Sequence, residues 1–186
     1  TASSLDGKLY DNYGGADDNY GDVCPTATSE MTLEFWIKSD STSSSQGYIV
    51  TTGSTGWNLR YTPSSNAWVL FSNAFDSNGQ MSLGTHDIAD NAWHHVVWIY
   101  DGSATNEIRT YVDGNLELET DAQSGALTLN DVPLLIGYRR IGGEKYYRYY
   151  LDEIAYWTDI ALTDSQVKSL YNEGKALNSS AGVQRG

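Results

Sequence analysis

The chain has little cysteine, proline or phenylalanine, few cations and no long apolar run. Cys24 is its only cysteine, so no disulfide forms within the chain and cysteine usage does not indicate a redox compartment. No run of about 18 apolar residues occurs, so we expect no membrane insertion. The 24 Asp and Glu outnumber the 11 Lys and Arg, which gives a formal net charge of −13. We therefore expect neither a nucleic-acid partner nor docking on anionic lipid, since both require positive potential.

The abundant aromatic residues are tyrosine (14) and tryptophan (6), which combine an apolar ring with a polar group. Such residues serve cores with hydrated edges, and they also serve flat binding faces. With 186 residues, the chain suits a single domain with a full core.

Most of the chain from Met31 onwards consists of short segments typical of β-strands, separated by turn-forming residues. In residues 31–38 the side chains alternate, with one apolar face formed by Met31, Leu33, Phe35 and Ile37. Asp113-Gly114 lies between two alternating segments, which is a strong hairpin signal. About ten to twelve such segments predict an all-β, antiparallel sandwich or jelly roll.

One short helix is predicted after the last strand. Thr163 and Gln166 have the spacing of a capping box at the start of a helix. The apolar stripe that follows consists of Val167, Leu170 and Tyr171. Gly174 suits the left-handed residue that ends a helix. We expect this helix to cover one edge of the β-sandwich.

Four segments occur in the order seen in laminin-G-like domains of the concanavalin A-like lectin/glucanase superfamily, which the chain therefore resembles. They read DNAWHHVVWIYDG, TYVDGNLEL, LLIGY and LDEIAYWTDIALTDSQVKSLYNEGK. EMTLEFWIKSD is similar to an early strand of the family, and GADDNYGDV loosely to its opening turn. The resemblance covers roughly residues 15–175 and implies a two-sheet jelly roll. We expect the domain to span residues 1–175 and residues 176–186 to form a flexible tail or linker. The resemblance leaves the function open, because this fold serves many functions.

Catalytic carboxylates are not expected. Glucanases on this fold carry the order Glu-x-Asp-x-x-Glu, so that two carboxylates flank the sugar bond. The nearest acidic runs, at 117–121 and 152–153, lack this order. His94 and His95 are adjacent, so on a strand they point to opposite faces and cannot hold one ion together. Packing and hydrogen bonding account for them better.

The acidic opening segment suggests calcium. Asp11, Asp17, Asp18 and Asp22 lie among asparagines and glycines, and hard oxygen ligands on a bent loop suit Ca²⁺. Many laminin-G-like domains hold calcium near the rim of the sandwich, and this resemblance implies Asp17, Asp18 and Asp152 as ligands. The alternative is a solvated turn built from ordinary turn residues.

The segment LLIG also resembles a strand of pentraxins, relatives on the same sandwich. Pentraxins bind paired calcium through the acidic loop after this strand. Here the loop begins Tyr138-Arg139-Arg140, and arginine does not ligate calcium. Calcium-bridged binding of phosphocholine is therefore not expected.

The segment after LLIG is unusually basic and aromatic for an acidic protein, and it focuses positive potential in one place. We predict that it binds an anionic glycan, because arginine matches carboxylate or sulfate and tyrosine stacks on sugar rings. The predicted ligand-binding residues are Tyr138, Arg139, Arg140, Tyr146, Tyr147 and Arg148. The alternative is that the tyrosines fill the core while the arginines balance nearby acids.

These observations favour a non-catalytic carbohydrate-binding or adhesion domain, stabilised by calcium and located outside the cell or on a cell or virion surface. One alternative is a structural module within a larger assembly or multidomain protein, such as a virion decoration protein or a surface-adhesin domain. A polysaccharide hydrolase or lyase is the third hypothesis.

Overall fold

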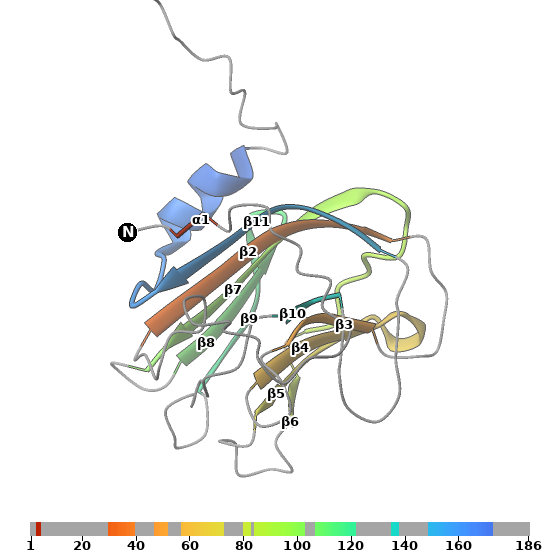
Figure 1. Ribbon diagram of the computed structural model, residues 1–186, viewed down its shortest axis with the longest axis horizontal. Helices are drawn as coiled ribbons and strands as arrows, with labels where there is room; N and C mark the ends of the chain where they lie inside the picture. The colour runs from red at the N-terminus through yellow and green to blue at the C-terminus, as the bar shows by residue number, and fades with distance from the viewer. Residues whose placement is uncertain are drawn as a thin grey trace, which may run out of the picture.

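The computed structural model describes residues 3–4, 30–39, 47–51, 57–72, 80–82, 84–102, 107–121, 135–137 and 149–172. These residues form two antiparallel sheets that pack face to face, with one helix outside them (Figure 1). The predicted two-sheet jelly-roll sandwich is confirmed.

The larger sheet has six strands in the order β1-β11-β2-β7-β8-β9. Their bounds are Ser3–Ser4 (β1), Tyr149–Thr158 (β11), Glu30–Ser39 (β2), Trp93–Asp101 (β7), Glu107–Val112 (β8) and Asn115–Asp121 (β9). The smaller sheet has the order β10-β3-β4-β5-β6. Its strands are Leu135–Ile136 (β10), Gly47–Thr51 (β3), Trp57–Thr62 (β4), Ala67–Ser72 (β5) and Gln80–Ser82 (β6), and a 3₁₀ turn, Pro63–Ser65, follows β4.

The core lies between the two sheets. Apolar and polar residues alternate along β2, so one face of this strand is directed into the core. The apolar set of residues 31–38 is fully buried there, as the period-two pattern predicts. Three tryptophans, Trp57, Trp68 and Trp98, are also fully buried. The ring centroids of Trp57 on β4 and Trp98 on β7 lie 5.3 Å apart, so this contact joins the two sheets.

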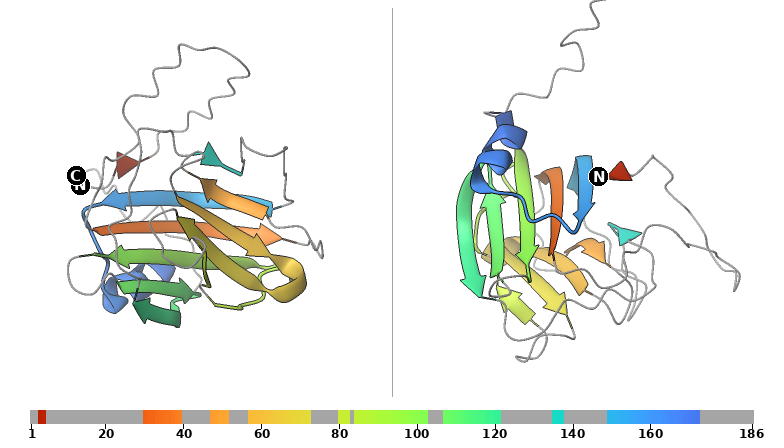
Figure 2. Two further views of the ribbon diagram at one scale, coloured as in Figure 1. Left: turned by 90° about the horizontal axis from the view of Figure 1, so that it is seen from below. Right: turned by 90° about the vertical axis from the view of Figure 1, so that its left-hand side faces the viewer.

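Helix α1, Asp164–Tyr171, covers part of the outer face of the six-stranded sheet, rather than one edge of the sandwich as expected (Figure 2). Val97, Ile99 and Tyr111 of this face pack against Leu162 and Val167. No helix in the described parts of the chain is long and apolar enough to cross a membrane.

Both ends of α1 have defined caps. The capping box forms as predicted, because Thr163 N–H donates to Gln166 Oε1 at 2.8 Å and Gln166 N–H donates to Thr163 Oγ1. The predicted end at Gly174 is wrong. Asn172 is the left-handed cap, with φ of 44°, because asparagine also tolerates this conformation.

The β8–β9 hairpin turns at Asp113 and Gly114, whose φ angles are 50° and 72°. Two consecutive positive φ angles match the turn type that the Asp-Gly signal predicts. A Cβ atom at Gly114 would lie 2.8 Å from the ring of Tyr171 in α1. Glycine therefore allows both the turn and the close approach of the helix.

Candidate functional site

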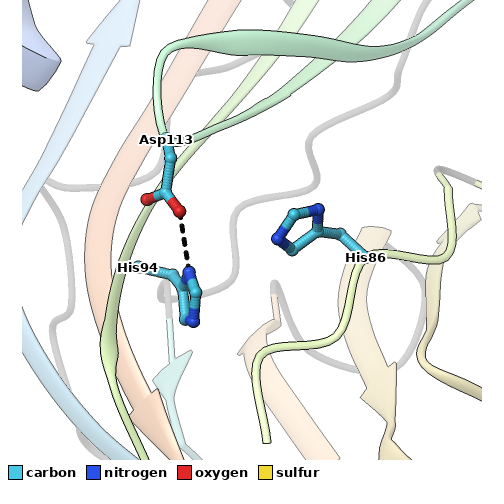
Figure 3. Close-up of side chains that lie close together, drawn as sticks. All are labelled: His86, His94 and Asp113. Carbon is cyan, nitrogen blue, oxygen red and sulfur yellow. Dashed lines mark hydrogen bonds and ion pairs between the residues drawn. The ribbon is translucent and has the colours of Figure 1, made fainter. Parts of the chain in front are cut away.

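Three side chains with metal-ligating atoms meet where a loop, a strand and a hairpin turn come together (Figure 3). His86 lies in the segment 84–92 before β7, His94 lies near the start of β7, and Asp113 lies in the β8–β9 turn. One nitrogen or oxygen from each lies within 4.8 Å of the others. We call these residues the His86–His94–Asp113 cluster.

His94 has a carboxylate on each ring nitrogen. Its Nδ1 lies 2.8 Å from Asp113 Oδ2, and its Nε2 lies 3.1 Å from Asp90 Oδ1. Its side chain is only 11% exposed. The bond to Asp113, helped by Asp90, raises the pKa of His94 against the opposing effect of burial. A ring protonated on both nitrogens donates to both acids.

Asp113 uses each carboxylate oxygen for a different partner. Oδ2 faces His94, and Oδ1 accepts the His95 N–H at 2.9 Å. Burial alone would raise the pKa of Asp113, but the bonds from His94 and the His95 N–H together lower it. The Asp113 N–H also donates to the His95 carbonyl, so the turn is fixed to β7.

His86 approaches from the opposite side. Its Nδ1 lies 3.5 Å from Glu117 Oε2, and its ring centroid lies 5.7 Å from that of His94. This approach depends on Gly84, which has φ of +112° and where a Cβ would lie 2.9 Å from Glu117. Glycine at 84 therefore lets the loop pass close to β9.

The loop that carries His86 is held by hydrogen bonds on both sides of it. Trp68 N–H donates to the Gly84 carbonyl at 3.0 Å, and Ile88 N–H donates to the Tyr61 hydroxyl at 3.1 Å. The Asp90 carboxylate accepts the Ala92 N–H at 2.8 Å, which, with the bond to His94, lowers the pKa of Asp90. The loop is therefore anchored to the smaller sheet.

The prediction that His94 and His95 point to opposite faces is confirmed. His95 Nε2 lies 2.8 Å from Glu34 Oε1, and its ring stacks on Tyr171 of α1. His94 does join a cluster of possible metal ligands, but with His86 rather than His95. Sequence reasoning missed His86 because its partners lie 8 and 27 positions away, on other elements. The Asp-Gly pair predicts the turn at Asp113, but nothing in the local sequence indicates that His86 and His94 lie beside it.

A second feature lies on the outer face of the six-stranded sheet, beside α1. Tyr150 pairs in register with Lys38, and Lys38 pairs with Trp93. Residues paired in this way share a face, so the three side chains form a row across β11, β2 and β7. Tyr150 is 67% exposed and Trp93 is 43% exposed. We call these residues the Tyr150–Lys38–Trp93 row.

The predicted glycan-binding residues lie outside the described part of the chain. They are Tyr138, Arg139, Arg140, Tyr146, Tyr147 and Arg148. Of the predicted calcium ligands, Asp17 and Asp18 also lie outside it. Asp152 is exposed at a β-bulge of β11, and its Oδ1 accepts the Glu153 N–H at 2.9 Å. Both site predictions therefore remain predictions.

The acidic run on β9 does not form a facing pair of carboxylates at positions 117 and 119. A bulge makes Glu117 an extra residue, and its carboxylate faces His86. Glu119 pairs in register with Arg109, whose guanidinium reaches Asp164 on the helix side at 3.2 Å. Glu117 and Glu119 therefore face different sides of the sheet.

The sequence of residues 12–168 matches a family model described as the concanavalin A-like lectin/glucanases superfamily. The chain belongs to this superfamily. No curated protein matches its sequence.

Solved structures with the same fold include a native heptameric SAP-like pentraxin from Limulus polyphemus. The identity is 21% and the TM-score 0.62, over 80% of this chain and 72% of the pentraxin. A botulinum neurotoxin serotype D ligand-binding domain, solved in complex with N-acetylneuraminic acid, has 15% identity and a TM-score of 0.61. A type C neurotoxin, whose cell entry depends on two ganglioside molecules, has 12% identity and a TM-score of 0.61.

This chain covers only part of each toxin chain. The matches take in 79% and 81% of this chain but 37% of each toxin chain. At these identities, the likeness shows the fold alone.

Proposed function

We propose that this domain binds carbohydrate without transforming it, outside the cell or on a cell or virion surface. The observation that carries the proposal is the exposed Tyr150–Lys38–Trp93 row. Membership of the superfamily supports it, since many members of this fold are binding modules. The acidic runs support a non-catalytic role, because the sequence lacks Glu-x-Asp-x-x-Glu and Glu117 and Glu119 face apart.

The row has the chemistry of a sugar platform. The Cβ atoms of residues paired on adjacent strands lie about 5 Å apart, so those of Tyr150 and Trp93, two strands apart, are separated by about 10 Å. That spacing suits two successive sugar rings, each with its apolar face on one aromatic ring. Lys38 lies between them and donates up to three hydrogen bonds to hydroxyl or acid groups.

The row is held on a fixed part of the sheet. The Tyr149 hydroxyl donates to the Tyr48 carbonyl, which joins the start of β11 to the smaller sheet. Arg148 directly precedes Tyr149, so the predicted basic segment 138–148 leads into the row. We therefore extend the predicted site to include Lys38, Trp93 and Tyr150, and we propose a uronic, sialic or sulfated glycan as the ligand. The sialic-acid complex of the serotype D domain supports this ligand class.

A glycan array, with and without EDTA, tests the function. We expect binding to acidic glycans, reduced at least tenfold by Trp93→Ala or Tyr150→Ala. Leu116→Ala is a matched control, because Leu116 is another large apolar residue, 46% exposed, on β9 at the sheet edge. The absence of binding to both neutral and acidic glycans, with and without EDTA, would contradict the proposed function. If both aromatic variants bind glycans as the parent does, the binding site does not include this row.

The enzymatic and structural alternatives make different predictions. A hydrolase or lyase would release new sugar ends from a polysaccharide, whereas the binding domain leaves the polymer length unchanged. A structural module would form a wide contact between chains. A monomer in light scattering that also binds glycans would favour the binding domain.

A further inference from the structure

We propose that the His86–His94–Asp113 cluster binds a divalent transition-metal ion, with Zn²⁺ preferred. The cluster and the Tyr150–Lys38–Trp93 row lie on opposite faces of the six-stranded sheet, although Trp93 and His94 are neighbours in the chain. The cluster faces the inner side of the six-stranded sheet, because His94 pairs in register with the core residue Ile37. The proposal does not depend on carbohydrate binding.

The donor atoms suit such an ion. Two imidazole nitrogens and one carboxylate oxygen are the ligands of many zinc sites. Around tetrahedral Zn²⁺, ligand atoms lie about 3.4 Å apart, given metal–ligand bonds of about 2.0–2.1 Å. The 2.8 Å contact between His94 Nδ1 and Asp113 Oδ2 needs only a small opening, and the third donor lies within 4.8 Å. Figure 3 shows a ring nitrogen of His86 directed toward the other two residues.

The surrounding carboxylates are a second, independent observation. A metal-bound histidine almost always donates its other ring N–H to a carboxylate, carbonyl or water. Asp90 occupies this position on Nε2 of His94 at 3.1 Å, and the Glu117 carboxylate lies 3.5 Å from Nδ1 of His86. This leaves His94 Nδ1 and His86 Nε2 as the ligating nitrogens. Each ring therefore has a carboxylate beside its outer nitrogen, hydrogen-bonded in the case of His94.

The scaffold limits the motion needed to bind an ion. Asp113 is fixed to β7 through the His95 N–H and carbonyl, so Oδ2 is the carboxylate oxygen that faces His94. The loop around His86 is anchored through Gly84 and Ile88. Such supporting bonds hold ligands near their binding positions.

The same donors disfavour calcium, which takes oxygen ligands. The Irving–Williams order places Zn²⁺ and Cu²⁺ above Mn²⁺ for sites with imidazole. Binding removes one proton from His94, because the ligating Nδ1 must give up its hydrogen, and that proton goes to solvent. Three protein ligands leave a fourth position for water or an oxygen of a bound molecule.

The test uses the full chain without a polyhistidine tag, stripped with EDTA and dialysed. Zn²⁺ is titrated by calorimetry, and Co²⁺ is followed by its visible absorption. We expect one ion per chain and at least tenfold weaker binding in His86→Ala. His86 is the residue to change, because it is partly exposed and its loss leaves the bond between His94 and Asp113 in place. Glu119→Gln is the matched control on the opposite side of β9, with binding equal to the parent's.

Two results would overturn the proposal: no stoichiometric binding by the parent, or equal affinities in the parent and His86→Ala. The cluster would then be a hydrogen-bonded clamp that holds the β8–β9 turn without metal. The melting temperature of the stripped protein checks that His86→Ala is folded. If that variant melts early, His86→Gln, which keeps a polar group near Glu117, is measured in its place and judged by the same outcomes.

Discussion

Asp113 Oδ2 lies 2.8 Å from His94 Nδ1, and this contact joins residues 19 positions apart in the chain. It connects the β8–β9 turn to the start of β7. The second oxygen of Asp113 accepts the His95 N–H at 2.9 Å, so one carboxylate bridges two successive residues of β7. The turn is therefore held by a side chain as well as by the strand ladder.

Replacing this carboxylate should destabilise the protein measurably. We expect Asp113→Ala to lower the free energy of unfolding by about 2–3 kcal/mol, since it removes two charge-assisted hydrogen bonds. Asp113→Asn should cost about 1 kcal/mol, because asparagine still accepts the His95 N–H and suits a left-handed turn position. Urea unfolding of the EDTA-treated protein measures both values. An Asp113→Ala variant as stable as the parent would contradict a stabilising role for the carboxylate.

Gly114→Ala should destabilise the hairpin for two separate reasons. Its φ of 72° is unfavourable for alanine, and its Cβ would lie 2.8 Å from the Tyr171 ring. We expect a loss of about 1–3 kcal/mol in thermal or urea unfolding. The double variant Gly114→Ala with Tyr171→Ala separates the two causes, because it removes the ring and keeps the φ angle. Strictly additive losses would show that the contact with Tyr171 contributes nothing.

Tyr149 should make the protein sensitive to alkali. Burial raises the pKa of Tyr149 above its ordinary value of 10.0, so the native state favours the neutral phenol. Its contribution is complete below the unfolded pKa of about 10 and is lost as pH rises above it. We expect the melting temperature to fall less steeply between about pH 9 and 11 in Tyr149→Phe than in the parent. If the melting temperatures of the parent and Tyr149→Phe fall equally with pH, ionisation of Tyr149 does not cause the loss of stability.

Calcium should stabilise the protein if the predicted site at Asp17, Asp18 and Asp152 exists. Adding Ca²⁺ to EDTA-treated protein should then raise the melting temperature, because an ion that binds only the folded state stabilises it. Asp152→Asn should reduce this gain. Glu153→Gln is the control, since Glu153 is the neighbouring exposed acid on β11. A melting curve unchanged by Ca²⁺ would contradict the prediction.

Features set by neighbours in sequence could be predicted well. The alternation of residues 31–38 gives β2, the Asp-Gly pair gives the β8–β9 turn, and Thr163 with Gln166 gives the start of α1. In each case, the decisive interaction spans at most a few residues, so the local pattern carries it. The end of α1 differs from the prediction, because Asn172 tolerates a left-handed conformation well enough to replace glycine.

The candidate sites could not be predicted in the same way. His86 meets His94 only because Gly84 allows the loop to approach β9. The Tyr150–Lys38–Trp93 row exists only because three strands align in a particular register. Register depends on the packing of the whole sheet, and no short pattern in the sequence specifies it.

Helix α1 also has a consequence for synthesis of the chain. The apolar outer face that it covers, formed by Val97, Ile99 and Tyr111, is translated about 60 residues before the helix, at ordinary rates several seconds earlier. During that interval the apolar residues Val97, Ile99 and Tyr111 lack the contacts with Leu162 and Val167 that bury them in the folded protein. We expect nascent chains paused before Thr163 to associate with chaperones or with one another. Once helix α1 is synthesised and packs on these residues, this association should stop.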